Sequence, residues 1–165
     1  MIYLLCFFLN GLYHIDVDFR LSTTRGTHMR PTLIAGLSAS HRIEIDPARS
    51  IDFLGETLRV YATPELVRDF ETVCRELILA HTDPGEDSVG TGIAISHGGA
   101  TLCGMHVDIT VTVSKIEGRL VTFELRANDA IEEISRGSHS RFVVEIEKLR
   151  KKVAEKAAKS REAQG

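Results

Sequence analysis

The sequence predicts an α+β domain in which an antiparallel sheet wraps around one long central helix. Two observations carry this prediction. Residues 63–80 place apolar side chains at helical spacing, and the chain from 89 to 149 contains several segments in which apolar and polar residues alternate. A single long helix followed by a run of strands is typical of a sheet packed against that helix.

The helix is expected to begin at Thr63 and to end near Ala80. Thr63 is a suitable N-cap, Pro64 suits the first helical position, and the charge of Glu65 suits the first turn. Its apolar stripe is wide, which indicates burial against a large surface. The stripe consists of Leu66, Val67, Phe70, Val73, Cys74, Leu77 and Ile78.

Strand patterns lie on both sides of this helix. Residues 41–46 alternate and residues 58–62 form a second short extended segment, while a turn at 83–85 precedes an alternating run from Val89 to His97. Three later runs follow, the first two separated by a turn at 117–118. Their expected core-facing residues are Val107, Ile109, Val111 and Val113; Val121, Phe123, Leu125 and Ala127; and Phe142, Val144 and Ile146.

The length of 165 residues fits one folded domain, and 43% apolar residues are enough for a core. We expect an N-terminal extension over 1–37, not necessarily native or ordered, the domain over 38–150, and a basic helical tail over 151–165. The apolar run at 1–12 is too short to span a bilayer, which takes about 20 residues in a helix. The basic tail lacks interleaved aromatic residues, so we expect it to be solvated.

Charge and cysteine content exclude several classes of function. A formal net charge of -3 gives no general attraction to nucleic acid or to an anionic membrane, so neither partner is expected. The three cysteines contain no CxxC pair, which argues against a disulfide framework and a thiolate zinc site. A reducing cytoplasm is the expected location.

Glu71 is an unusual residue for its position. Helical spacing places it at or beside the apolar stripe, where a carboxylate costs free energy unless it is paired or protonated. One interpretation is a boundary residue that reaches solvent or pairs with Arg75. The other is a functional carboxylate with a raised pKa.

His97 is the second unusual residue. It ends the strand SVGTGIAISH in register with Val89, Thr91, Ile93 and Ile95, on the expected core face, and Gly98 and Gly99 follow. It is either a hydrogen-bonded core histidine or a catalytic one. The histidines at 41, 81, 106 and 139 are scattered without metal-ligand spacing, and no HxxxH or HExxH motif occurs, so no metal is expected.

Four segments in order resemble the fluoroacetyl-CoA thioesterase-like family: ATPELVRDFE, PGEDSVGTGIAISH, the stretch from Gly104 to Ile116-Glu117-Gly118-Arg119, and GSHSRFVV. The likeness covers about residues 38–150. It implies the hot-dog fold and a catalytic group formed by Thr63, Glu71 and His97. It also implies that Gly90 and Arg141 contribute to substrate binding.

The activity implied by this resemblance is hydrolysis of an acyl-CoA thioester to a free acid and CoA, without a cofactor. Glu71 would either orient a water or attack the thioester itself, with His97 as the base. Two alternatives remain: a non-catalytic acyl-CoA-binding or sensing module, and an enoyl-CoA hydratase. The Glu71 and His97 pair favours hydrolysis over sensing, and the usual hydratase pair, an aspartate five residues before a histidine on the helix, is absent.

The sequence departs from the family pattern in two places. The segment SIDFLGETLRVY stands where the fluoroacetyl-CoA enzyme has an aromatic, proline-containing lid, with Phe53 and Tyr61 as its only aromatic substitutes. The segment GGATLCG after His97 has no proline. These departures argue against fluoroacetate specificity and leave the acyl group open.

The resemblance also implies a homodimer. Eight residues on one straight helix would separate Thr63 from Glu71 by about 12 Å along its axis. Either the helix bends after Thr63, or each site combines groups from two subunits. Arg141 alternates with Phe142 on the last strand, so we expect it to point away from the apolar face, either toward substrate or paired with Glu145.

Overall fold

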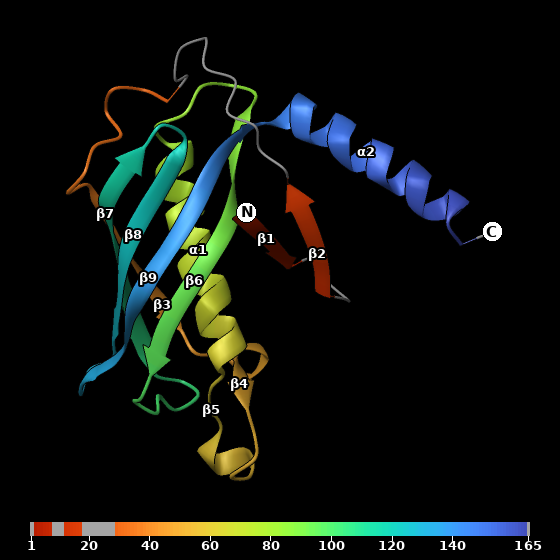
Figure 1. Cartoon of the computed structure of the whole chain (residues 1–165). Coiled ribbons are helices and arrows are strands. Elements are labelled where there is room, and N and C mark those ends of the chain that lie inside the picture. Colours follow the sequence, from red (N-terminus) through yellow and green to blue (C-terminus); the bar gives the residue numbers. More distant parts are fainter. Residues whose placement is uncertain (1, 8–11, 18–28, 165) are drawn as a thin grey trace.

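The computed structural model describes residues 2–7, 12–17 and 29–164 (Figure 1). Of the first 28 residues, only the backbones of two short strands are described, so residues 1, 8–11 and 18–28 of the expected N-terminal extension lie outside the described residues. The strands are β1 (Ile2–Phe7), β2 (Leu12–Val17), β3 (Ser38–Glu44), β4 (Ser50–Ile51), β5 (Val60–Tyr61), β6 (Glu86–His97), β7 (His106–Glu117), β8 (Leu120–Asn128) and β9 (Glu133–Glu145). The helices are α1 (Thr63–Leu79) and α2 (Ile146–Glu162), with short 3-10 turns η1 (Pro47–Arg49) and η2 (Glu56–Leu58).

The main sheet has five strands in the order β3-β7-β8-β9-β6, and every neighbouring pair is antiparallel. Helix α1 runs along one face of this sheet (Figure 1). The predicted arrangement of one long helix against an antiparallel sheet is therefore confirmed.

The core lies between α1 and the inner face of the sheet. The alternating residues predicted on β7 and β8 are all buried, as are the predicted stripe residues of α1 except Val67, which is partly buried. These side chains form one hydrophobic cluster, which also includes Leu33 and Ile45. Because Leu33 is buried, the packed unit begins ahead of β3.

The predicted face of the last strand is wrong. In the second half of β9 the buried residues are His139, Arg141 and Val143, whereas Phe142 and Val144 are only partly buried and Ile146 begins α2. The reason is the register with β8, in which Phe123 stands opposite His139 and Val121 stands opposite Arg141. Opposed residues of an antiparallel pair share a face, so the polar side chains of β9 point inward with the apolar ones of β8.

A β-bulge changes the side-chain phase of β6. Gly90 pairs with Arg141 and Gly92 pairs with Ser140, which leaves Thr91 as the extra residue. The expected common register of Val89 with Ile93 and His97 is therefore wrong. Before the bulge Ser88 and Gly90 face inward, and after it Ile93, Ile95 and His97 are the more buried positions.

Helix α2 leaves the sheet at the end of β9 and projects away from the domain (Figure 1). None of its residues is buried, and its surface is rich in lysine and arginine. Within the described residues, no helix is both long and apolar enough to cross a membrane.

Candidate active site

Thr63 and His97 meet at the N-terminal end of α1. The Thr63 Oγ1 atom lies 2.9 Å from His97 Nδ1. The helix begins at Thr63 itself, and the residue before it, Ala62, makes no side-chain cap. The N-cap role expected for Thr63 is therefore wrong, because its hydroxyl is directed to His97 instead.

His97 is half-buried at the last position of β6. The chain turns immediately after it, where the Gly98 and Gly99 amides both donate to the Ile134 carbonyl oxygen. Burial lowers the pKa of His97, and a hydrogen bond with the Gly99 backbone partly opposes that shift. The uncharged imidazole is therefore favoured at neutral pH, which leaves His97 able to accept a proton.

Tyr61 supports His97 from the side. The two rings contact edge to face, with centroids 6.0 Å apart. The Tyr61 hydroxyl donates to Asp69 Oδ2 at 2.6 Å, and Arg49 Nε lies 3.1 Å from the same oxygen. Burial, followed by this bond to Asp69, raises the pKa of Tyr61. Tyr61 is therefore a fixed wall of the site rather than a lid residue, whereas Phe53 is 71% exposed.

Glu71 lies on α1 against the strand β6. A Cβ atom added to Gly90 would stand 2.4 Å from Glu71 Oε1, so the carboxylate occupies the space that a side chain at position 90 would need. Burial raises the pKa of Glu71, while the nearby Arg141 charge opposes the shift. Since the side chain remains 27% exposed, this carboxylate is accessible from solvent.

Arg141 points inward beneath Glu71, so the predicted outward orientation is wrong. Its Nε donates to Ser88 Oγ at 2.9 Å and its Nη2 donates to the Ser88 carbonyl at 2.8 Å. Its Nη1 lies 3.8 Å from Glu71 Oε1 and 3.4 Å from the Glu71 carbonyl oxygen. The predicted alternative partner, Glu145, instead pairs with Arg119 and Lys148.

His139 belongs to the same cluster, although it is not among the residues predicted for the site. Its Nε2 lies 3.2 Å from Arg141 Nη1 and 3.6 Å from Glu71 Oε1. The signal that could have found it is its spacing of two residues from Arg141, because residues two apart on a strand share a face. The apolar pattern at Phe142 and Val144 pointed to the opposite face.

The predicted catalytic residues thus form two groups within one chain. Thr63 and His97 are in contact, and Glu71 sits with Gly90, His139 and Arg141. Because α1 runs unbroken from Thr63 to Leu79, Thr63 and Glu71 are about 12 Å apart along its axis. On β9, the partners of His97 and Gly90 are Ser135 and Arg141, which an extended strand separates by about 20 Å.

Comparisons with known proteins decide the family. The family model for fluoroacetyl-CoA-specific thioesterase matches residues 45–147. A fluoroacetyl-CoA thioesterase from Streptantibioticus cattleyicolor is 30% identical over 135 residues, covering 78% of this chain and 97% of that protein. The chain belongs to the fluoroacetyl-CoA-specific thioesterase family.

Solved structures agree with this family. A threonine-to-alanine variant of the fluoroacetyl-CoA thioesterase, in complex with fluoroacetate, has a TM-score of 0.69 at 30% identity, covering 75% of this chain and 98% of that one. A hot-dog-like protein from Thermanaerovibrio acidaminovorans has a TM-score of 0.69 at 22% identity, covering 77% and 93% of the two chains. The hot-dog fold expected from the sequence is therefore confirmed.

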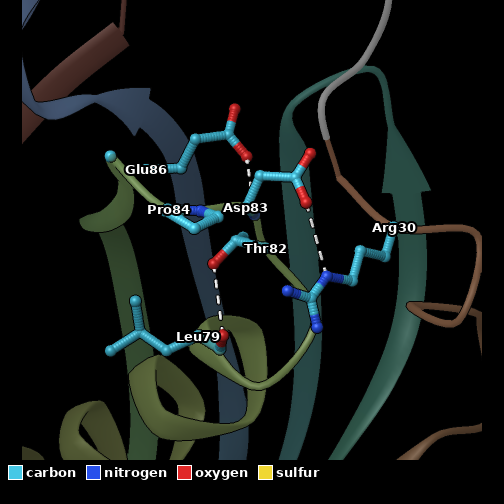
Figure 2. A pocket seen from close by; sticks show the side chains of 7 residues that line it. Arg30, Leu79, Thr82, Asp83, Pro84 and Glu86 are labelled. Carbon is cyan, nitrogen blue, oxygen red and sulfur yellow. Dashed lines mark hydrogen bonds and ion pairs between the residues drawn. The ribbon is translucent and has the colours of Figure 1, made fainter.

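Residues 45–147, which the family model matches, include both groups of candidate site residues. A hollow elsewhere on the protein is lined by neither group. This hollow of about 300 Å³ lies at the C-terminal end of α1. Its lining includes Leu79 and Thr82, and Asp83, which pairs with Arg30 (Figure 2). Its lining contains none of Thr63, Glu71 and His97. The hollow is therefore separate from the residues that we consider as the active site of this fluoroacetyl-CoA-specific thioesterase family member.

Proposed function

We propose that this protein hydrolyses an acyl-CoA thioester to a free acid and CoA, with Thr63, Glu71 and His97 as its catalytic group. The observation that carries the proposal is the position of the Glu71 carboxylate between Gly90 and Arg141. The Glu71 carboxylate is partly exposed and has a raised pKa; it fills the space that a side chain at position 90 would need, and it lies beside the buried Arg141. A carboxylate in such an environment is better suited to act as a base or nucleophile than a carboxylate on the open surface is.

We further propose a homodimer in which each site combines Glu71 of one chain with Thr63 and His97 of the other. The separation of the two groups within one chain supports this arrangement. Strand β6 stands at an edge of the main sheet and carries Gly90 before its midpoint and His97 at its end. If β6 paired antiparallel with its copy about a centre between Ile93 and Ala94, Gly90 of each chain would lie opposite the partner's position 97.

This pairing has one requirement in the N-terminal region. In the single chain, β1 contacts β6. The hairpin β1–β2 would therefore have to leave that part of the edge before a second chain could pair along it.

In the proposed reaction the thioester carbonyl carbon is attacked, its bond to sulfur breaks, and CoA leaves as a thiol. On the first route, His97 takes a proton from a water that Glu71 orients, and then returns the proton to the departing thiolate. On the second route, a Glu71 oxygen attacks the carbonyl carbon, and water opens the resulting anhydride. Thr63 holds the His97 imidazole in either case.

We propose binding roles for Gly90 and Arg141 that differ in directness. Gly90 gives the carboxylate and the acyl group close access to the backbone of β6. Arg141 is only 5% exposed and its guanidinium is bonded to Ser88, so we assign it to the support of Glu71 rather than to CoA phosphate. No cofactor is needed, because water is the only co-substrate.

We also propose an acyl group other than fluoroacetyl and a cytoplasmic location. In the segment that replaces the family lid, Phe53 and Leu54 are exposed, which suits contact with an apolar acyl chain. Cys74 and Cys103 are both free thiols, as a reducing compartment would keep them.

The test of activity is release of free thiol from a series of acyl-CoA substrates, starting with acetyl-CoA and increasing in chain length. Parent protein should release thiol, and Glu71→Gln and His97→Ala should not. Binding of acyl-CoA without thiol release would instead indicate a sensing module. Hydration of an enoyl-CoA without thiol release would indicate a hydratase.

Mixed dimers test the two-chain site. A dimer of one Glu71→Gln chain and one His97→Ala chain keeps one site with both groups intact if each site draws on two chains. The mixture should then regain activity that both single variants lack. A site contained within one chain predicts no recovery, and a protein that is active as a monomer would refute the dimer.

A further inference from the structure

The cluster around Arg141 contains a buried histidine to which the proposed reaction gives no role. His139 is 1% exposed and lies on the inner face of β9, between the bulge of β6 and the Glu71 carboxylate. A polar ring in such a position costs free energy unless both of its nitrogens are bonded. Both nitrogens of His139 have partners.

Those partners allow only one protonation state of the ring. His139 Nδ1 lies 2.9 Å from the Gly92 carbonyl oxygen, which can only accept, so Nδ1 carries the proton. His139 Nε2 lies 3.2 Å from Arg141 Nη1, which can only donate, so Nε2 carries a lone pair. The ring is therefore uncharged, and its contact with Glu71 is not an ion pair.

Burial has the same consequence. It lowers the pKa of His139 to about 4, with the bond to Gly92 opposing the shift and the Arg141 charge adding to it. His139 therefore stays neutral across the physiological range of pH, and its Nε2 remains an acceptor for Arg141.

Arg141 is held close to Glu71 without a direct bond to its carboxylate. Ser88 binds two of its nitrogens, and His139 and the Glu71 carbonyl oxygen occupy the third. The distance of 3.8 Å from Nη1 to Glu71 Oε1 is too long for a hydrogen bond. The guanidinium charge thus favours the ionised carboxylate through space, while the carboxylate lone pairs stay free.

We propose that His139 is a positioning residue for Glu71: by accepting a hydrogen bond from Arg141, it keeps the guanidinium beside the carboxylate without letting the two bind directly. A carboxylate that accepts a charged hydrogen bond from an arginine is a weaker base, because that bond stabilises its ionised form. Ser88 holds the other two Arg141 nitrogens, and His139 keeps Nη1 from making that bond to Glu71. The inference rests on the proposed catalytic role of Glu71.

Other titratable and charged groups face this cluster and bear on any measurement of pH dependence. Helix α1 contributes the buried thiol of Cys74 and the guanidinium of Arg75. Strand β6 contributes the carboxylate of Asp87, which pairs with Arg75.

Two substitutions of His139 distinguish the role of its hydrogen-bond acceptor, Nε2, from the role of the volume of its ring. His139→Leu removes the acceptor, so Arg141 should turn onto Glu71 and lower the pKa of its carboxyl. We expect kcat to fall about tenfold or more at little change in KM. The acid limb of the pH profile should move down by roughly one unit or more. His139→Gln offers an amide oxygen to Arg141 and should restore most of the rate and of the profile.

A control and a spectroscopic measurement complete the test. His41 is an exposed histidine that pairs with Glu76, so His41→Leu should keep the parent rate and profile. In the parent protein, nitrogen-15 NMR should show the His139 ring protonated at Nδ1 with no titration between about pH 5 and 8. This readout does not depend on turnover.

Several results would overturn the inference. A folded His139→Leu protein with the parent pH profile would do so, as would a folded His139→Gln protein as impaired as the leucine variant. An Nε2-protonated or charged ring in the NMR spectrum would also refute it, even if His139→Leu did not fold. If Glu71→Gln hydrolysed substrate at the parent rate, the proposed function would fail instead, and the NMR result for His139 would stand.

Discussion

Gly90→Ala is the substitution that most directly tests how Glu71 is seated. The new methyl carbon would stand 2.4 Å from Glu71 Oε1 and 3.2 Å from His139 Cε1. Ordinary contact for such a carbon begins at 3.4 Å, so the carboxylate must move by about 1 Å. The histidine is fixed by Gly92 and Arg141, and the end of the glutamate side chain is the part that can give way.

The expected effect is large on rate and small on stability. A catalytic group misplaced by about 1 Å can cost on the order of 10²-fold in rate, so kcat should fall by about that factor. Overpacking of a fixed core costs about 1–3 kcal/mol, and the mobile end of Glu71 should keep the loss of unfolding free energy at the lower end. The assay is thiol release at saturating acyl-CoA, with urea unfolding measured in parallel.

Gly92→Ala is the matched control, because it lies on the same strand and a Cβ there has no atom within 4 Å. Its main-chain carbonyl remains available to His139. We expect this variant to keep most of the parent kcat. If Gly90→Ala turned over at the parent rate while Glu71→Gln was inactive, the close packing of the carboxylate against β6 would not matter for catalysis.

Three further predictions concern coupling, acid stability and support of the site. Glu71→Gln and His97→Ala should each lower kcat by on the order of 10²–10⁴, and the double variant should be little worse than the poorer single one; additive losses would refute a shared step. The pKa of His139 falls from 6.5 to about 4 on folding, so the unfolded chain binds protons more readily between these values and stability should drop as pH falls through them. The loss, about 3 kcal/mol in urea titrations, should be absent from His139→Gln. Tyr61→Phe should cost about 1–3 kcal/mol of unfolding free energy by leaving Asp69 with one partner fewer, and an unchanged urea midpoint would contradict this.

Much of the fold could be predicted because alternation and helical spacing are local properties of the chain. The apolar residues of β7 and β8 alternate without interruption, and the stripe on α1 is wide, so their buried faces were predicted correctly. The buried face of β9 was predicted wrongly. The apolar Phe142 and Val144 suggested that their face is buried, whereas pairing with β8 buries the face that carries His139 and Arg141. Register between strands depends on residues distant in sequence, which a single strand does not report.

By itself, the sequence determined the fold class, the family and the candidates Thr63, Glu71 and His97, because motif order and apolar periodicity are written along the chain. Only the tertiary structure decided which of them meet. The straight helix α1 carries Thr63 to His97 and leaves Glu71 two turns away. The bulge at Gly90 and the register of β9 turn His139 and Arg141 inward, so that Glu71 gains its charged neighbours from a strand about 70 residues further along the chain.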